Sequence, residues 1–188
     1  TEKLSDVFDK MPTIFPIPND APHEIPFMIL SSQNNLTTCN ISRSRIDLIT
    51  MDKMLIKNEN KLNEFIDEVC KARDIIQFGF VATHFKSTDK ASEDIKQRFL
   101  KNNEEIKDLS IRYNKPTKIN KEIYNYHFSI SDIKQQNINT NSIEVGLMIQ
   151  RDINNISLNI KNEIFVSSKL KSILKNSQDI LYSSEINA

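Results

Sequence analysis

Two segments in the second half of the chain have an aromatic or aliphatic residue at every second position, and this pattern constrains the fold most. In residues 124–130 every second side chain is aromatic or aliphatic, and residues 143–150 repeat the pattern with aliphatic side chains. Successive side chains of a strand point to opposite faces, so a period of two predicts strands with one buried face. These segments therefore predict an antiparallel sheet that covers a core.

Shorter patterns predict the other elements. Residues 75–85 are apolar at both alternate positions, which favours a strand in the middle of the sheet. Residues 101–120 are the most polar part of the chain and predict a long loop. The other predicted strands begin at Ile25 or span 36–42, 45–51 and 156–160, with Asn34–Asn35 and Asn154–Asn155 as turns. Helical spacing of apolar residues predicts helices at 4–11, 58–73, 87–100 and 167–181.

The order of these elements predicts an α+β protein with a largely antiparallel sheet and about three helices packed on one face. With 188 residues, we expect a single domain spanning 1–188. Residues 1–26 contain five of the six prolines, and proline withholds a backbone donor. We therefore expect this segment to be an extended arm that leads into the first strand.

The balance of charges limits the choice of partners. The chain has 25 Lys and Arg residues and 25 Asp and Glu residues, so its formal net charge is zero. A nucleic-acid partner is disfavoured because it would require a basic excess, whereas neutrality favours self-association into a homo-oligomer. No apolar run is long enough to cross a membrane. The two cysteines lie in no metal-binding or redox motif, which fits the cytoplasm.

Motifs for catalysis or cofactor binding are almost absent. With only two glycines the chain has no phosphate-binding loop, and we expect no cofactor and no metal. The exception is His127 with Ser129, a His-x-Ser pattern typical of one half of a phosphoesterase that uses two histidines as acid and base. His84 is the candidate second histidine, although Lys86 replaces the expected Ser or Thr. The alternative is a strand whose polar face includes these residues.

Two groups of side chains are candidates for binding. Arg43 and Arg45 share one face of an extended segment and could receive an anion, or else could simply protect a sheet edge. The second group comprises the apolar side chains of the arm and the start of the first strand, which either bind a polypeptide partner or cover the protein's own core. Its members are Phe15, Ile17, Ile25 and Phe27.

The segment PNDAPHEI, residues 18–25, resembles the Pro-Asn-Ala-Pro-His segment near the start of the SecB-like export chaperones, with Asp20 inserted. A broad set of small bacterial proteins has a comparable proline-rich opening. The resemblance implies an antiparallel sheet with helices on one side, assembly into dimers and tetramers, and apolar grooves that hold unfolded chains. Some relatives serve toxin–antitoxin systems.

Together these features favour a non-enzymatic protein that binds a polypeptide, either as a chaperone or as a subunit of a toxin–antitoxin or phage-related complex. The alternative hypothesis is a phosphoesterase or nuclease that uses His127.

Overall fold

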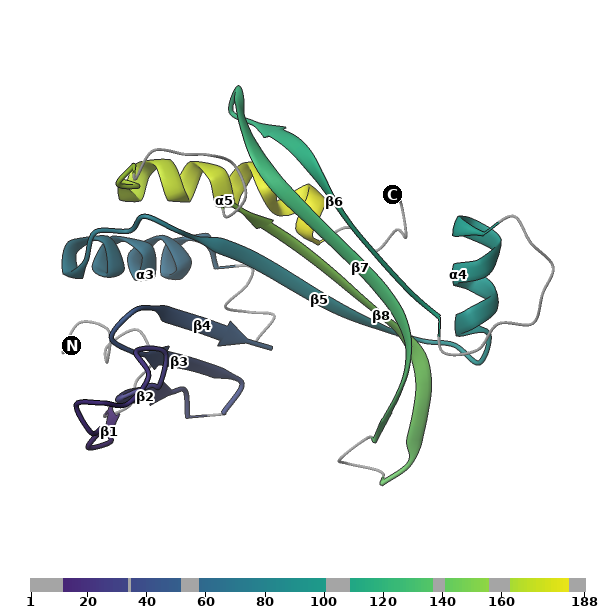
Figure 1. Ribbon diagram of the computed structural model, residues 1–188, viewed down its shortest axis with the longest axis horizontal. Helices are drawn as coiled ribbons and strands as arrows, with labels where there is room; N and C mark the ends of the chain where they lie inside the picture. The colour runs from purple at the N-terminus through teal and green to yellow at the C-terminus, as the bar shows by residue number, and fades with distance from the viewer. Residues whose placement is uncertain are drawn as a thin grey trace. The chain divides into compact units, whose positions relative to one another are not determined.

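The computed structural model describes residues 12–33, 35–51, 58–100, 109–136, 141–155 and 163–182. The chain divides into two compact units. Unit 1 comprises Thr1–Ile75 and Phe165–Lys171, and unit 2 comprises Ile76–Ile164 and Ser172–Ala188. The described residues form two antiparallel sheets of four strands each and three helices, which confirms the predicted α+β class (Figure 1). The expectation of a single domain stays a prediction.

Unit 1 contains a meander in which each strand pairs with the next along the chain. The strands are β1 (Thr13–Ile14), β2 (Met28–Ser31), β3 (Thr37–Ile41) and β4 (Ile46–Thr50). The register places Leu30, Cys39 and Leu48 side by side, and the first two are fully buried. This apolar row forms the centre of the unit 1 core.

Helix α3 (Glu59–Ala72) contributes the side chain of Phe65 to this core. Its predicted ends are confirmed, because Asn58 caps the first turn by accepting a 3.2 Å hydrogen bond from the Lys61 backbone N–H, and Arg73 is the C-cap. The helix is also joined to the start of α5 (Ser167–Leu181), where Lys171 Nζ lies 2.5 Å from an Asp67 carboxylate oxygen.

Unit 2 is built around the longer sheet, in the order β5-β8-β7-β6 (Figure 1). Helix α4 (Ala91–Phe99) follows β5 and packs on β7 and β8, and the second part of α5 also belongs to this unit. The strands are β5 (Gly79–Ser87), β6 (Ser110–Ile119), β7 (Glu122–Gln136) and β8 (Ile143–Asn154).

The alternation predicted for residues 124–130 is confirmed by burial in this sheet. In residues 143–150 it is confirmed only from Leu147 onward, because Ile143 and Val145 are exposed in the part of β8 that extends beyond β5 and β6. One face carries the buried apolar side chains of β7 and β8, and α4 contacts it through the Phe99 ring, 6.2 Å from the Phe128 ring. Helix α5 reaches the same face where the Leu181 carbonyl meets His84. We call it the covered face, and the opposite one the open face. The buried apolar residues that β7 and β8 give to the covered face are Tyr124, Tyr126, Phe128, Ile130, Leu147, Ile149 and Ile153.

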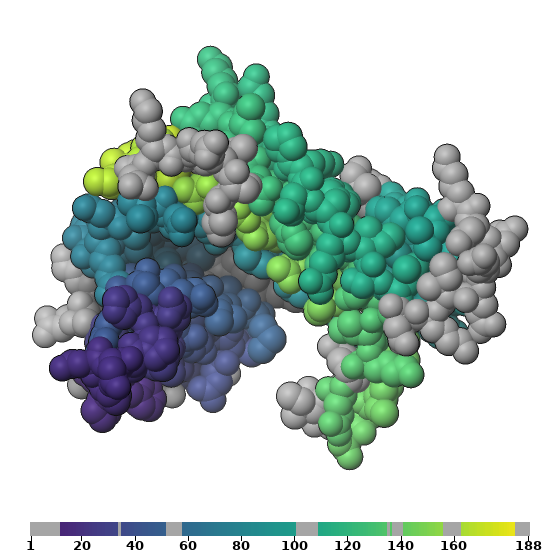
Figure 2. Space-filling view, viewed as in Figure 1, coloured from purple at the N-terminus to yellow at the C-terminus, as the bar shows by residue number. Residues whose placement is uncertain are grey.

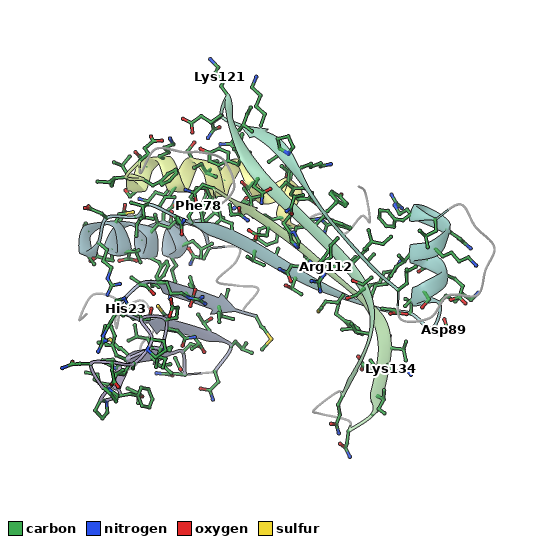
Figure 3. The ribbon with its side chains drawn as sticks, in the orientation of Figure 1. His23, Phe78, Asp89, Arg112, Lys121 and Lys134 are labelled. Carbon is green, nitrogen blue, oxygen red and sulfur yellow. The ribbon has the colours of Figure 1, made fainter. Side chains whose placement is uncertain are left out.

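The hairpin of β7 and β8 extends beyond the other two strands. The pairing of β6 ends opposite Ser131 and that of β5 ends opposite Gly146, whereas β7 and β8 remain paired as far as Gln136 and Ile143. This two-stranded end is marked by Lys134 in Figure 3, and Lys121 marks the turn between β6 and β7. Figure 2 shows the same end as a narrow extension of unit 2.

Two predictions about this sheet are wrong. Residues 79–87 of the segment placed in the middle form β5, which is an edge strand, because β8 pairs between β5 and β7. The predicted loop 101–120 includes the ten-residue strand β6. This strand forms because Ile111, Tyr113 and Ile119 turn toward the covered face while polar residues occupy the open face.

Other predictions fall partly outside the described residues. These are the helix at 4–11, Asn34 of the first turn and the strand at 156–160. Asn35, the other residue of that turn, adopts a positive φ of 56°. Of the proline-rich arm, residues 12–26 are described, and they include β1 and two turns closed by hydrogen bonds to the carbonyls of Pro18 and Pro22.

Candidate functional site

The arm of unit 1 is held down by the loop between β3 and β4. The Arg43 guanidinium donates hydrogen bonds of 3.0 and 3.1 Å to the backbone carbonyls of Asn19 and Pro18. The backbone N–H of Ser44 donates to the carbonyl of His23, which is labelled in Figure 3. The segment that carries the SecB-like motif is therefore fixed against its own sheet.

The four apolar residues predicted to bind a partner have different environments. Phe15 and Ile25 are both 43% exposed, Ile17 is half-buried, and Phe27 packs against the core residues of the sheet. The first two are thus available for contact with a partner, whereas Phe27 stabilises unit 1.

The edge strand β4 adds further exposed apolar surface, which the sequence patterns did not single out. Ile49 is 58% exposed, and Met51, directly after the strand, is 73% exposed. The single charged residue of β4 is Asp47, whose carboxylate lies 2.7 Å from Arg45 Nε and is thereby neutralised. Among the described residues, only β3 pairs with β4.

The backbone of β4 presents hydrogen-bonding groups along its outer side. The Met51 N–H bonds to Leu36 and the Ser42 N–H bonds to Arg45, which fixes the alternation of bonded pairs between β3 and β4. In an antiparallel ladder every second residue faces its neighbouring strand. The amides and carbonyls of Ile46 and Leu48 therefore point away from β3.

The predicted anion site has both of its guanidinium groups already bonded to oxygen atoms of the chain. Arg43 bonds to the arm carbonyls and Arg45 to Asp47. The carbonyl of Arg43 itself accepts a 2.9 Å hydrogen bond from Arg73, at the end of α3. In this arrangement the arginines position the arm and the edge strand, and anion binding stays a prediction.

The candidate catalytic residues lie in unit 2, and the two histidines are on opposite faces of the sheet. His127 and Ser129 are on the open face, in register with Asn114 and Arg112 of β6. His84 is on the covered face, where its Nε2 lies 3.1 Å from the Leu181 carbonyl oxygen. The two histidines therefore do not form the facing pair that a two-histidine phosphoesterase requires.

His127 instead lies in a polar row that runs across the strands. Its Nδ1 is 2.6 Å from the side-chain oxygen of Asn114, and its cross-strand neighbour on β8 is Asp152. The Asp152 Oδ2 atom accepts a 2.8 Å hydrogen bond from the Asn154 side chain, whose own oxygen accepts a 3.1 Å hydrogen bond from Asn125. The row therefore joins side chains of three strands.

Burial raises the pKa of Asp152, while the hydrogen bond from Asn154 and the charge of His127 act in the opposite direction with smaller effect. Its Oδ1 atom is buried and has no hydrogen-bond partner among the described residues. A histidine beside a carboxylate can exchange a proton, but no three metal-binding side chains cluster in the described part of the chain. The alternation could have identified Asp152, because it follows Glu144 and Gln150 at every second position and so lies on the same face of the strand as they do.

No protein-family model, curated protein or solved structure matches this chain. None of the described helices is both long and apolar enough to cross a membrane.

Proposed function

We propose that the protein is a non-enzymatic polypeptide-binding protein, which holds an extended segment of its partner against β4. The observation that carries the proposal is this edge strand, whose one charge is neutralised within the chain and which is flanked by the exposed side chains of Ile49 and Met51. Natural proteins commonly protect exposed edges with charges, proline or bulges, so an apolar edge is typical of a strand-addition site.

Strand addition would use the outward backbone groups of Ile46 and Leu48 for hydrogen bonds. The side chains of these two residues are half-buried against the unit 1 core, together with Phe65 of α3. Every second side chain of an added strand would contact Ile46 and Leu48, and the side chains between them would contact Ile49. Burial of one aliphatic side chain contributes about 1.5–3 kcal/mol, and several such contacts would be needed to offset the loss of freedom on association.

The resemblance of residues 18–25 to SecB-like chaperones supports the same class of function, since that resemblance implies binding of unfolded polypeptides. The partner is either a set of unfolded clients or one dedicated protein, such as a component of a toxin–antitoxin or phage-related complex. A cytoplasmic location fits, because the chain keeps both cysteines as free thiols.

The test is binding of a fluorescently labelled, permanently unfolded client protein, measured by anisotropy. Ile49→Lys should weaken binding about tenfold or more, because it places a charge on the apolar edge. Ile123→Lys is the matched control, since Ile123 is 56% exposed and lies on β7 in unit 2; it should leave binding unchanged.

Capture of proteins from the native host with the same variants separates the two kinds of partner. One stoichiometric protein lost from Ile49→Lys would identify a dedicated partner, and many unrelated proteins would identify a general chaperone. The proposal is wrong if the wild-type protein binds no client and captures nothing, or if both lysine variants weaken binding equally.

A further inference from the structure

The two edges of the unit 2 sheet differ in how they are protected. The edge strand β6 has ten residues and contains Arg112, Lys115, Lys118 and Pro116. The opposite edge strand, β5, has nine residues with no proline, and Lys86 is its one residue with a full charge. Since an unprotected edge is a template for pairing, the contrast indicates that β5 has a partner strand.

The backbone direction of β5 follows from its ladder with β8. The Thr88 N–H bonds to the Val145 carbonyl, so Lys86, His84, Ala82 and Phe80 are the β5 residues bonded to β8. The amides and carbonyls of the residues between them point outward. These residues are Gly79, Val81, Thr83, Phe85 and Ser87, and all except the half-buried Phe85 are exposed.

The backbone direction of β6, at the other edge, follows from its ladder with β7. The Asp132 N–H bonds to the Leu109 carbonyl, which places Pro116 at an outward position of β6. Proline has no N–H, so at this position it costs no ladder hydrogen bond and blocks the approach of another strand. The sheet is therefore closed to strand addition at β6 and open at β5.

We infer that β5 pairs with β5 of a second copy of this chain, antiparallel and centred on Thr83, to give a continuous eight-stranded sheet. Thr83 is the middle residue of the strand and points its backbone outward, so a two-fold axis through it pairs all nine residues. The outward residues of both copies form about ten hydrogen bonds across the axis.

The side chains of β5 are complementary to themselves in this register. Val81 of one copy faces Phe85 of the other, and Thr83 faces Thr83; both are favourable cross-strand pairs. Lys86 faces Phe80 of the other copy, so no like charges are opposed. A two-fold interface needs a self-complementary surface, and this strand has one.

The full-length chain tests the inference by sedimentation velocity over a wide range of concentration. The wild type should be a dimer, and Thr83→Pro should raise its dissociation constant about ten- to a hundredfold, because each copy loses one hydrogen-bond donor at the axis. Lys118→Pro is the control, since it changes an outward position of the already protected β6 edge, and it should leave the dimer intact.

A charge exchange tests the position of the axis and does not depend on a loss of folding. Thr83→Lys and Thr83→Glu chains should each be monomeric, because like charges would face each other, and an equimolar mixture should recover the dimer. Circular dichroism of each variant verifies that it is folded. A monomeric wild type, or a dimer that persists in both Thr83→Lys and Thr83→Pro, would overturn the inference, and neither result bears on client binding at β4.

Discussion

Gly146 offers the sharpest test of the packing in unit 2. This residue lies in β8, directly beneath the ring of Phe85 on the neighbouring strand. A Cβ atom on Gly146 would lie 2.5 Å from the Lys86 carbonyl oxygen and 2.6 Å from the ring carbon Cζ of Phe85. The backbone oxygen cannot move without breaking the β5–β8 ladder, so Gly146→Ala forces strain into the sheet.

The expected cost follows from two opposing effects. Overpacking of a sheet core costs about 1–3 kcal/mol, whereas replacement of glycine by alanine gains about 0.4–1 kcal/mol by restricting the unfolded chain. With the middle value of each range, about 2 kcal/mol less about 0.7 kcal/mol, the net destabilisation is about 1.3 kcal/mol. For a chain of this length that corresponds to a fall of about 3–5 °C in the unfolding temperature.

The second glycine of the chain is the matched control. At Gly79, on β5, the nearest atom to an added Cβ is Asp152 Oδ1 at 3.6 Å, an ordinary contact distance. Gly79→Ala therefore keeps the entropic gain without the strain, and it should raise the unfolding temperature by about 1–4 °C. The two substitutions are chemically identical, so only their surroundings distinguish them.

The tyrosine fluorescence of the chain reports on unit 2, which contains both glycines. All four tyrosines belong to unit 2, namely Tyr113, Tyr124, Tyr126 and Tyr182, and the chain has no tryptophan. Tyrosine emission during thermal unfolding therefore follows the sheet that holds both glycines. Equal shifts of the two alanine variants, or a Gly146→Ala protein as stable as the wild type, would refute the packing argument.

Two further predictions concern buried ionisable groups. Burial raises the pKa of the Cys39 thiol from 9.0 to about 12, and the charge of Asp47 adds to the shift; its contribution to stability is therefore complete below pH 9 and is lost as the pH rises toward 12. We expect Cys39→Ala to show a weaker loss of stability than the wild type over that range in alkaline unfolding followed by circular dichroism, and parallel curves would contradict this. Burial also raises the pKa of Asp152, so the charged form is disfavoured in the folded state at neutral pH. Asp152→Asn should raise the unfolding temperature at pH 7 by roughly 1–3 °C and should lose that advantage below pH 4, where the wild-type carboxyl is protonated; a lower unfolding temperature at pH 7 would show that the charge itself stabilises the sheet.

Local patterns predicted the elements that bury a single face. The alternation in residues 124–130 and 143–150 lies within β7 and β8, and the apolar stripe of residues 58–73 became α3 with both ends at the expected positions. These predictions succeeded because, in an element with one buried face, apolar residues recur with the period of that helix or strand. The strands, however, divide between two sheets, and no local period reports which strands share a sheet.

The position of a strand within its sheet has no such local signature. Residues 75–85 were predicted to be central because apolar residues occupy both alternate positions, yet in the edge strand β5 Val81 is exposed and Phe80 is only half-buried. Tertiary pairing determines which strand lies beside β5. Its partner β8 lies some sixty residues further along the chain, so no local pattern can report the pairing. For the same reason the sequence could not place His127 beside Asp152, or separate His127 from His84.

Pro116 shows how a sequence pattern can be sound and still lead to the wrong element. The segment around it was predicted to be a loop because it is the most polar part of the chain, and proline does exclude a central strand. An edge strand satisfies the same restriction, provided that proline occupies an outward position, and the β6 ladder has this parity. A proline within alternating residues therefore identifies a protected edge, and the absence of one from the opposite edge leaves β5 as the side of the sheet at which another strand can pair.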